Sequence, residues 1–259
     1  MDVSPPDGPE TVTARFALRM PGGTLEADVT VPTGPTRVDE ILPTAQALAD
    51  QLISLALNVV EAEGRTVSCR AGCGACCRQL VPLAEAEARR LRDLIETMPE
   101  PRRTQIRSRF AEALRRFDEA GLLEALRQTD IQDKGRHREV GLDYFRQHVA
   151  CPFLEDESCS IHPDRPIACR EYLVTSDPGL CANPKKGEVE GVTLPTHVWT
   201  AVARFDPPHP GATSIRWVPL ILALDWAEVH PDPPAPRPGP ELLRELIGQV
   251  ARSEGKPSA

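Results

Sequence analysis

The chain has 259 residues, of which 41% are hydrophobic, and a formal net charge of −8. That hydrophobic content supports an ordinary core, so the chain does not need cysteine cross-links to fold, as short secreted scaffolds do. An acidic chain gains little from neutralising phosphates, which argues against a nucleic-acid-binding protein. Its basic residues are mostly arginine, a bias typical of GC-rich bacterial genomes.

The first ten residues lack the basic and apolar regions of a secretory signal. The most apolar stretch, residues 41–60, includes Pro43, Asp50 and Asn58 and is too polar for a membrane span. We therefore expect a cytoplasmic protein without a membrane partner, in which thiols stay reduced and disulfides are rare.

A β-hairpin is predicted near the N-terminus. The alternating runs Thr11–Met20 and Thr24–Val31 are separated by Pro21-Gly22-Gly23, a pattern typical of two strands and a tight turn. A mainly helical segment, Thr36–Glu63, follows, because its apolar residues recur at helical spacing.

Two further helices are predicted in the centre of the chain, at 84–98 and 102–128, from apolar residues at i, i+3, i+4 and i+7. The second has an arginine-rich face, which favours a solvated surface over a docking site for an acidic protein partner. Residues 130–141 are expected to form a loop.

The last third of the chain is predicted to consist of short elements. Ser214–Val218 is expected to be a strand, Pro219–Val229 a helix and Pro231–Pro240 a stiff, extended linker. A short amphipathic helix around 243–250 would end the chain.

The predicted fold class is mainly α with a small N-terminal β-hairpin and an irregular cysteine-rich metal-binding core. The predicted organisation is a leader and hairpin at 1–35, a helical cysteine-cluster domain at 36–230, and a proline-rich linker with a C-terminal helix at 231–259.

The first cysteine block contains Cys69, Cys73, Cys76 and Cys77, with the spacing C-x3-C-x2-C-C. Thiolates suit zinc, Cu(I) and iron–sulfur clusters and disfavour magnesium or calcium. Adjacent cysteines point in different directions in most backbone conformations. We therefore expect three ligands from this loop, with the fourth thiol serving a second centre or staying free.

The second block contains Cys151, Cys159, Cys169 and Cys181, spaced C-x7-C-x9-C-x11-C, unlike an ordinary zinc ribbon. Arg170 follows Cys169 directly and is a candidate cofactor contact, through a sulfur or an acidic group; the alternative is an ordinary ion pair.

Two histidines near the second block are further candidate ligands. His162 lies three residues after Cys159 and is either a ligand or a ring in a turn. His148 lies before Cys151, outside the block, and is the weaker candidate.

Two other interpretations of the cysteines are less favoured. One is a disulfide framework, which a reduced compartment disfavours. The other is a radical S-adenosylmethionine enzyme, which also uses C-x3-C-x2-C. Those enzymes usually have an aromatic residue where this chain has Ala75, and they need alternating strands and helices that the pattern here lacks.

Together the two blocks resemble the bacterial CxxCxxCC, or YkgJ-like, cysteine-cluster family over about residues 65–185. The first spacing here is x3, where the family name has x2. The matching pieces are Cys69-x3-Cys73-Gly74-Ala75-Cys76-Cys77-Arg78, Cys151-Pro152-Phe153-Leu154, Cys159-x-Ile161-His162 and Arg165-Pro166-x2-Cys169-Arg170. The resemblance implies a zinc- or iron-binding site. A related cluster occurs in flagellin lysine-N-methylases, which adds an enzyme hypothesis.

The sequence thus predicts a metal-binding protein that holds a zinc ion or an iron–sulfur cluster through cysteines of both blocks. Two alternatives stay open: a cluster-dependent protein-modifying enzyme, such as a lysine N-methyltransferase, and a thiol redox sensor. The expected partner is the metal ion or cluster, with a protein partner left open. The candidate ligands are Cys69, Cys73, Cys76, Cys77, Cys151, Cys159, Cys169 and Cys181.

Overall fold

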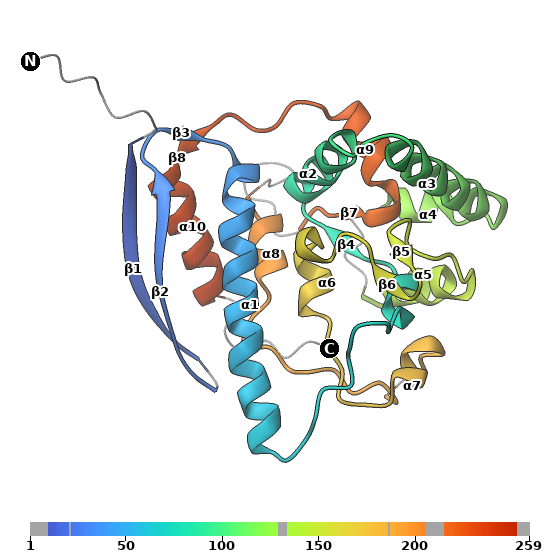
Figure 1. Ribbon diagram of the computed structural model, residues 1–259, viewed down its shortest axis with the longest axis horizontal. Helices are drawn as coiled ribbons and strands as arrows, with labels where there is room; N and C mark the ends of the chain where they lie inside the picture. Colours follow the sequence, from blue (N-terminus) through green and yellow to red (C-terminus); the bar gives the residue numbers. More distant parts are fainter. Residues whose placement is uncertain (1–9, 21, 129–133, 186, 206–214, 253–259) are drawn as a thin grey trace, which may run out of the picture.

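The computed structural model describes residues 10–20, 22–128, 134–185, 187–205 and 215–252. In these ranges the chain is mainly α-helical with a small antiparallel hairpin at its N-terminal end (Figure 1), as predicted. The strands are β1 (Thr11–Met20), β2 (Gly23–Pro32), β3 (Pro35–Thr36), β4 (Pro82–Leu83), β5 (Leu154–Glu155), β6 (Ser158–Cys159), β7 (Val218–Pro219) and β8 (Arg237–Pro238). The α-helices are α1 (Val38–Ala62), α2 (Glu85–Glu96), α3 (Arg102–Glu119), α4 (Leu123–Arg127), α5 (Lys134–Arg146), α6 (Ile167–Glu171), α7 (Pro178–Ala182), α8 (Val198–Ala203), α9 (Ala223–Val229) and α10 (Gly239–Arg252), and the 3-10 helices are η1 (Ala75–Arg78), η2 (His162–Asp164) and η3 (Leu220–Leu222).

The predicted hairpin is confirmed. Strands β1 and β2 pair antiparallel, from Thr11 opposite Pro32 to Met20 opposite Gly23. Gly22 in the turn has a φ of 91°, and a Cβ there would lie 2.7 Å from Cγ2 of Val59. The turn therefore needs glycine both for its backbone conformation and for its close approach to α1.

A first hydrophobic core joins the hairpin to α1, α8 and α10. Its buried side chains include Leu25 of β2, Leu42 and Ala49 of α1, and Leu246 of α10. The predicted helix Thr36–Glu63 is confirmed as α1, and Gly64, with a φ of 69°, follows its end. The two ends of the described chain are thus packed against each other.

A second hydrophobic core lies among α2, α3, α4, α5 and α9. Phe110 and Phe117 of α3 are buried there, and Phe117 stacks on Tyr144 of α5 with ring centroids 4.4 Å apart. Cys151 and Cys159 pack partly buried against this core. The second core therefore forms one wall of the cysteine region.

Helix α1 lies between the hairpin and the cysteine-bearing half (Figure 1). It contacts β2, α8 and α10 as well as α2 and α6. Helix α6 carries Cys169. Through its contact with α6, α1 therefore links the first core to the cysteine region.

Two predictions for the central helices need correction. The helix expected at 102–128 is interrupted: α3 ends at Glu119, Gly121 has a φ of 70°, and α4 begins at Leu123. The loop expected at 130–141 is wrong from Lys134 onward, since α5 begins there, while 130–133 lie outside the described residues. Tertiary packing of α5 onto the second core overrides its polar N-terminal sequence.

The C-terminal predictions are met in part. The strand expected at Ser214–Val218 is only Val218–Pro219, paired with β4, and Ser214 lies outside the described residues. The helix expected at Pro219–Val229 is a 3-10 turn followed by α9, and the helix expected at 243–250 is confirmed within α10. The end of the extended 231–240 segment pairs with β3 and enters α10.

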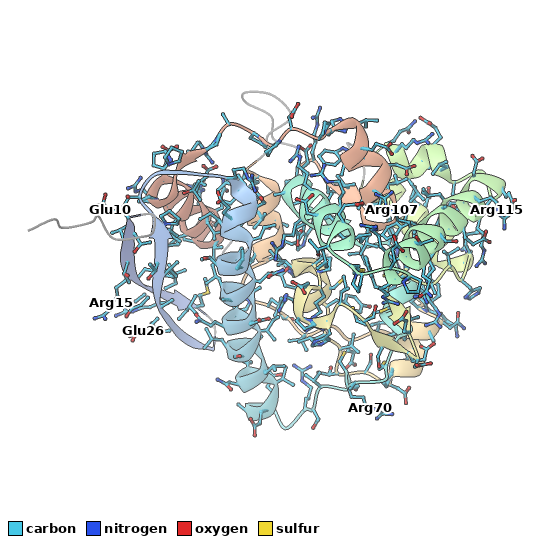
Figure 2. The ribbon with its side chains drawn as sticks, turned by 45° about the horizontal axis from the view of Figure 1, so that its top comes forward. Glu10, Arg15, Glu26, Arg70, Arg107 and Arg115 are labelled. Carbon is cyan, nitrogen blue, oxygen red and sulfur yellow. The ribbon has the colours of Figure 1, made fainter. Side chains whose placement is uncertain are left out.

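The arginine-rich face of α3 is divided between solvent and the neighbouring loops. Arg107 and Arg115 project from the surface (Figure 2), where Arg115 pairs with Glu112 and Glu119. Arg102 and Arg109 instead both bond Glu155 of β5, close to the second cysteine block. In the described ranges, the helices are too short or too polar to cross a membrane.

Candidate metal centre

The first cysteine block forms a tight loop. Gly72 has a φ of 81° at its turn, and Cys73 N–H donates to the carbonyl of Arg70. The chain then enters η1, where Cys77 N–H donates to the carbonyl of Gly74 at 3.0 Å. This short helix holds Cys76 and Cys77 side by side on the backbone.

Gly74 is where the second block packs directly on the first. A Cβ at Gly74 would lie 2.6 Å from Oε2 of Glu157 and 2.7 Å from Cδ1 of Leu154. Arg78 donates to the carbonyl of Gly74 and, at 2.7 Å, to the carboxylate of Glu157. The group that approaches Gly74 closely is the β5–β6 turn.

The substitution Gly74→Ala is expected to destabilise the protein by about 1–3 kcal/mol, because overpacking forces neighbours to shift. Gly141→Ala, within α5, is the control, since nothing lies within 4 Å of its Cβ position. The control should be neutral or stabilising. Urea unfolding of both variants measures the difference, and equal midpoints would contradict the close packing at Gly74.

Backbone hydrogen bonds join the two blocks. Cys151 N–H donates to the carbonyl of Cys77 at 2.7 Å. Ser68 N–H donates to the carbonyl of Val174 at 2.9 Å, and Val174 N–H donates to Sγ of Cys69 at 3.4 Å. The fold therefore brings together cysteines that are far apart in the sequence.

The second block presents its cysteines from separate short elements. Cys159 lies on β6 opposite Leu154 of β5, Cys169 on α6 and Cys181 on α7. All eight cysteines of the chain are free thiols, and Cys181 is buried whereas the other seven are half-buried.

Glu87 of α2 anchors α6. This buried carboxylate accepts hydrogen bonds from Ala84 N–H at 3.0 Å and from Ile167 N–H at 2.8 Å. Burial raises the pKa of Glu87 to about 7. Because Ile167 begins α6, Glu87 fixes the helix that carries Cys169.

Arg170 is a buried side chain that ties α6 to α1. Its guanidinium donates to the carboxylate of Asp50 at 3.0 Å, to the carbonyl of Arg165 at 3.1 Å, and to the carbonyl of Pro163. The contact with Asp50 is an ordinary ion pair, which the sequence offered as the alternative to a cofactor contact. A cofactor-binding role for Arg170 stays a prediction.

Burial raises the pKa of most of the thiols, in the case of Cys151 to about 12. The same cause acts on Cys69, Cys159, Cys169 and Cys181. Cys76 differs: the Cys77 thiol donates a hydrogen bond to it and lowers its pKa, while the pKa of Cys77 is raised. Buried neutral thiols become thiolates when a metal ion supplies the compensating charge.

Arg165 is a functional candidate that the sequence analysis missed. Its positive charge partly opposes the burial that raises the pKa of Cys69 and Cys159, and it adds to the lowering of the pKa of Cys76, so its charge acts on thiols of both blocks. Its Nε is buried without a hydrogen-bond partner. A thiolate-ligated metal carries net negative charge, which such a cation would offset.

We expect Arg165→Ala to weaken metal binding about 10- to 100-fold, as is usual for groups that support metal ligands. Arg165→Lys keeps the positive charge and should retain more of the affinity. Competition with a chelator of known affinity measures both variants. Unchanged affinity in Arg165→Ala would show that this charge does not act on the metal.

The side chains as they stand do not form a finished metal site. Among the described residues, no group of three or more His, Cys, Asp or Glu side chains is arranged to hold a metal ion. Four sulfurs must each lie about 2.3 Å from a zinc ion, so the thiols must rotate toward it. His162 is exposed and lies one 3-10 turn before Arg165, and the ring of His148 packs against Phe145.

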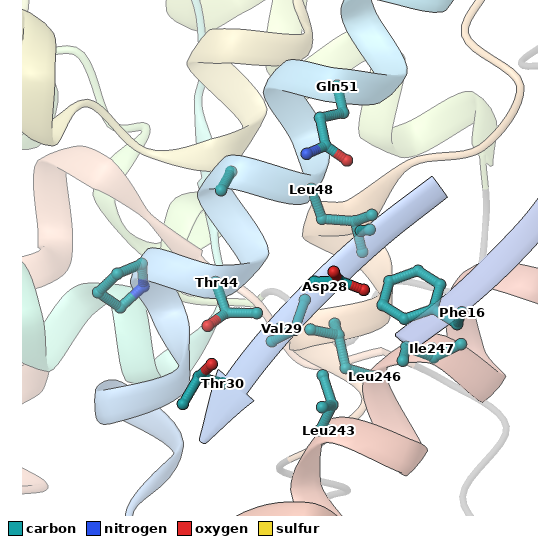
Figure 3. A pocket seen from close by; sticks show the side chains of 13 residues that line it. Phe16, Asp28, Val29, Thr30, Thr44, Leu48, Gln51, Leu243, Leu246 and Ile247 are labelled. Atoms are coloured by element: carbon teal, nitrogen blue, oxygen red, sulfur yellow. The ribbon is translucent and has the colours of Figure 1, made fainter. Parts of the chain in front are cut away.

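A separate pocket of about 320 Å³ lies between β2, α1 and α10 (Figure 3). Its lining is largely apolar, with Asp28 and Gln51 among the polar side chains. It contains no cysteine and lies on the hairpin side of α1, whereas α6 with Cys169 packs on the other side. Its lining thus offers no thiol chemistry.

Comparison with known proteins gives a match, and it covers the segment that contains the cysteines. Residues 68–190 match the family model CxxCxxCC, described as "Putative zinc- or iron-chelating domain". No curated protein and no solved structure gives a significant match to the chain. The matched segment begins one residue before Cys69 and includes all eight cysteines. Residues 68–190, less than half of the chain, are therefore similar to the zinc- or iron-chelating domains that the CxxCxxCC family model describes.

Proposed function

We propose that this protein is a cytoplasmic metal-binding protein whose cysteines from both blocks hold a zinc ion or an iron–sulfur cluster. The observation that carries the proposal is that hydrogen bonds join the two cysteine blocks, from Cys151 N–H to the carbonyl of Cys77 and from Val174 N–H to Sγ of Cys69.

The donor set fits a thiophilic metal. Zinc and iron–sulfur clusters both take cysteine thiolates, and both tolerate partly buried sites. When bound, the metal neutralises thiolates and cross-links the segments that carry them. This role suits a region built from two-residue strands and five-residue helices.

The test is anaerobic purification followed by metal and sulfide analysis and a visible spectrum. Iron with labile sulfide and a broad band near roughly 400 nm identifies an iron–sulfur cluster. A colourless protein with bound zinc identifies a zinc site. The control is His162→Ala, which should keep the metal if only thiols are ligands. A protein that binds neither metal in either form overturns the proposal.

A thiol redox function is the second candidate. It is favoured by Cys76, whose pKa is lowered by the hydrogen bond from Cys77, because a low pKa increases reactivity. Selective and reversible labelling of Cys76 in the metal-loaded protein would support it, and equal lack of reactivity in all the cysteines would contradict it.

The methyltransferase hypothesis rests on the family resemblance alone, and binding of S-adenosylmethionine tests it.

A further inference from the structure

The β5–β6 hairpin (Figure 1) reaches from the second cysteine block to the first cysteine loop. Its base lies on the second core, where Phe153 is buried and meets the ring of Phe110 edge-on, with centroids 5.6 Å apart. Its turn, Asp156-Glu157, lies against Gly74, where a Cβ would be 3.2 Å from Cα of Glu157. The hairpin therefore bridges the junction between the two blocks.

Helix α3 fixes the base of this hairpin. Glu155 accepts hydrogen bonds from Arg102 and, at 2.7 Å, from Arg109. Arg102 also donates to Oγ of Ser160 at 2.7 Å. Arg109 also donates to the carbonyl of Pro152 at 3.1 Å. Both ends of the hairpin are thus tied to α3 by several hydrogen bonds at once.

The turn of the hairpin is held by Arg78, which follows Cys77 in the first block. The guanidinium of Arg78 donates to both carboxylate oxygens of Glu157, at 3.0 and 2.7 Å, and to the carbonyl of Gly74 at 2.9 Å. A bidentate pair fixes orientation as well as distance. Because the Glu157 side chain is half exposed, water can replace Arg78 as its partner with a small loss of free energy.

The backbone of the turn does not favour glutamate. Two-residue hairpin turns with positive φ at both central residues prefer Asn-Gly or Asp-Gly. Here φ is 48° at Asp156 and 56° at Glu157. Aspartate tolerates this region better than glutamate, and a strained residue persists where its surroundings hold it. Glycine would suit the backbone at 157 but would lack the carboxylate that binds Arg78.

We propose that Arg78 and Glu157 are positioning residues that hold the β5–β6 hairpin closed on the first cysteine loop. Breaking their ion pair opens the junction at which Cys151 N–H bonds the carbonyl of Cys77, and gives solvent access to the thiols there. The inference deepens the proposed metal-binding function and rests on it in one respect: the closed hairpin slows exchange of a bound metal. Access to the thiols is a property of the metal-free chain as well.

Alkylation of the metal-free full chain, with peptide mass mapping, tests the inference. In Arg78→Glu, Cys77 and Cys151 should react about 3- to 10-fold faster, since like charges replace a half-exposed bidentate pair. Adding Glu157→Arg should return the rates most of the way to wild type. Unchanged rates in Arg78→Glu, or a double variant that reacts as fast as Arg78→Glu, overturn the inference.

The matched control is Arg15→Glu on the β1–β2 hairpin. Arg15 also forms a bidentate pair, with Asp28 at 2.7 and 2.9 Å, but no cysteine lies on either strand. Its loss should leave the alkylation rates of Cys77 and Cys151 at the wild-type values. An equal increase in this control would mean that loss of any surface ion pair loosens the protein, which contradicts a specific role for Arg78.

Two glycine substitutions separate the ion pair from the strain of the turn. Asp156→Gly and Glu157→Gly each remove a side chain from a position with positive φ, so the urea midpoint should change little in either. Only Glu157→Gly removes the partner of Arg78, so only this variant should show faster alkylation. Equal alkylation rates in the two variants overturn the inference.

Metal release gives a readout that distinguishes this inference from the proposed function. For protein loaded with zinc, transfer to an excess of chelator should be faster in Arg78→Glu and slower again in the double variant. Equal release rates in all variants overturn the role of the ion pair in exchange. A wild-type chain that binds no metal rejects the proposed function, while the alkylation rates still decide whether the hairpin closes the junction.

Discussion

Removing the metal should unfold the cysteine region while the first core stays folded. The segments around the cysteines are short, whereas α1 and α10 bury apolar side chains against the hairpin. Structural zinc contributes about 10–16 kcal/mol of binding free energy in small zinc-finger peptides. A loss of even part of that energy exceeds what the short elements can supply by packing.

Hydrogen exchange of the loaded and chelated protein measures this effect. We expect faster exchange in residues 68–80 and 150–182, with the amides of α1 and α10 still protected. Returning the metal should restore protection. Loss of protection in α1 and α10 as well would mean that the first core and the cysteine region unfold as one unit, coupled through the α1–α6 contact. Unchanged exchange would mean that the metal has no structural role.

The second large effect is expected for Gly239→Ala. A Cβ at Gly239 would lie 2.1 Å from the carbonyl oxygen of Pro32. That oxygen belongs to the backbone of β2 and cannot rotate away, so the clash must displace the start of α10 or the end of the hairpin. We expect a loss of about 3 kcal/mol or more, at the upper end for overpacking.

The matched control is Gly248→Ala in the same helix. The nearest atom to its Cβ position is Nη1 of Arg252 at 3.5 Å, the end of a flexible side chain. Replacing a glycine inside a helix by alanine should stabilise it by about 0.5–1 kcal/mol. The urea midpoint should therefore fall for Gly239→Ala and rise for Gly248→Ala. A Gly239→Ala variant as stable as the wild type would contradict the close packing of α10 on the hairpin.

Long periodic segments were predictable from the sequence because their local pattern and their packing agree. The β1–β2 hairpin, α1, α2 and α10 are of this kind. Helix α5 was not, since its N-terminal residues are basic and polar, although Val140 and Tyr144 pack on the second core. The break at Gly121 was missed because the apolar spacing continues across it.

The cysteines were recognisable from spacing, but their neighbours were not. Sequence order places Cys181 in the second block, while the pairing of 173–175 with Ser68 and Cys69 brings it to the first loop. Arg165 was part of the sequence motif, but its role could not be predicted because an arginine is ordinary in an arginine-rich chain. Only the fold shows that its charge lies among the thiols.

The hydrogen bond between Cys77 and Cys151 also has a consequence for biosynthesis. The first four thiols leave the ribosome well before their partners, by roughly several seconds at ordinary translation rates. Until Cys151 arrives, that loop has no second block to pack on. The first core is also incomplete until α10, the last described helix, has been made. If the cysteines of both blocks hold the metal as proposed, the full set of ligands exists only after Cys181 has been made, and a nascent chain stalled before residue 150 would present reduced thiols to any scavenging metal or oxidant.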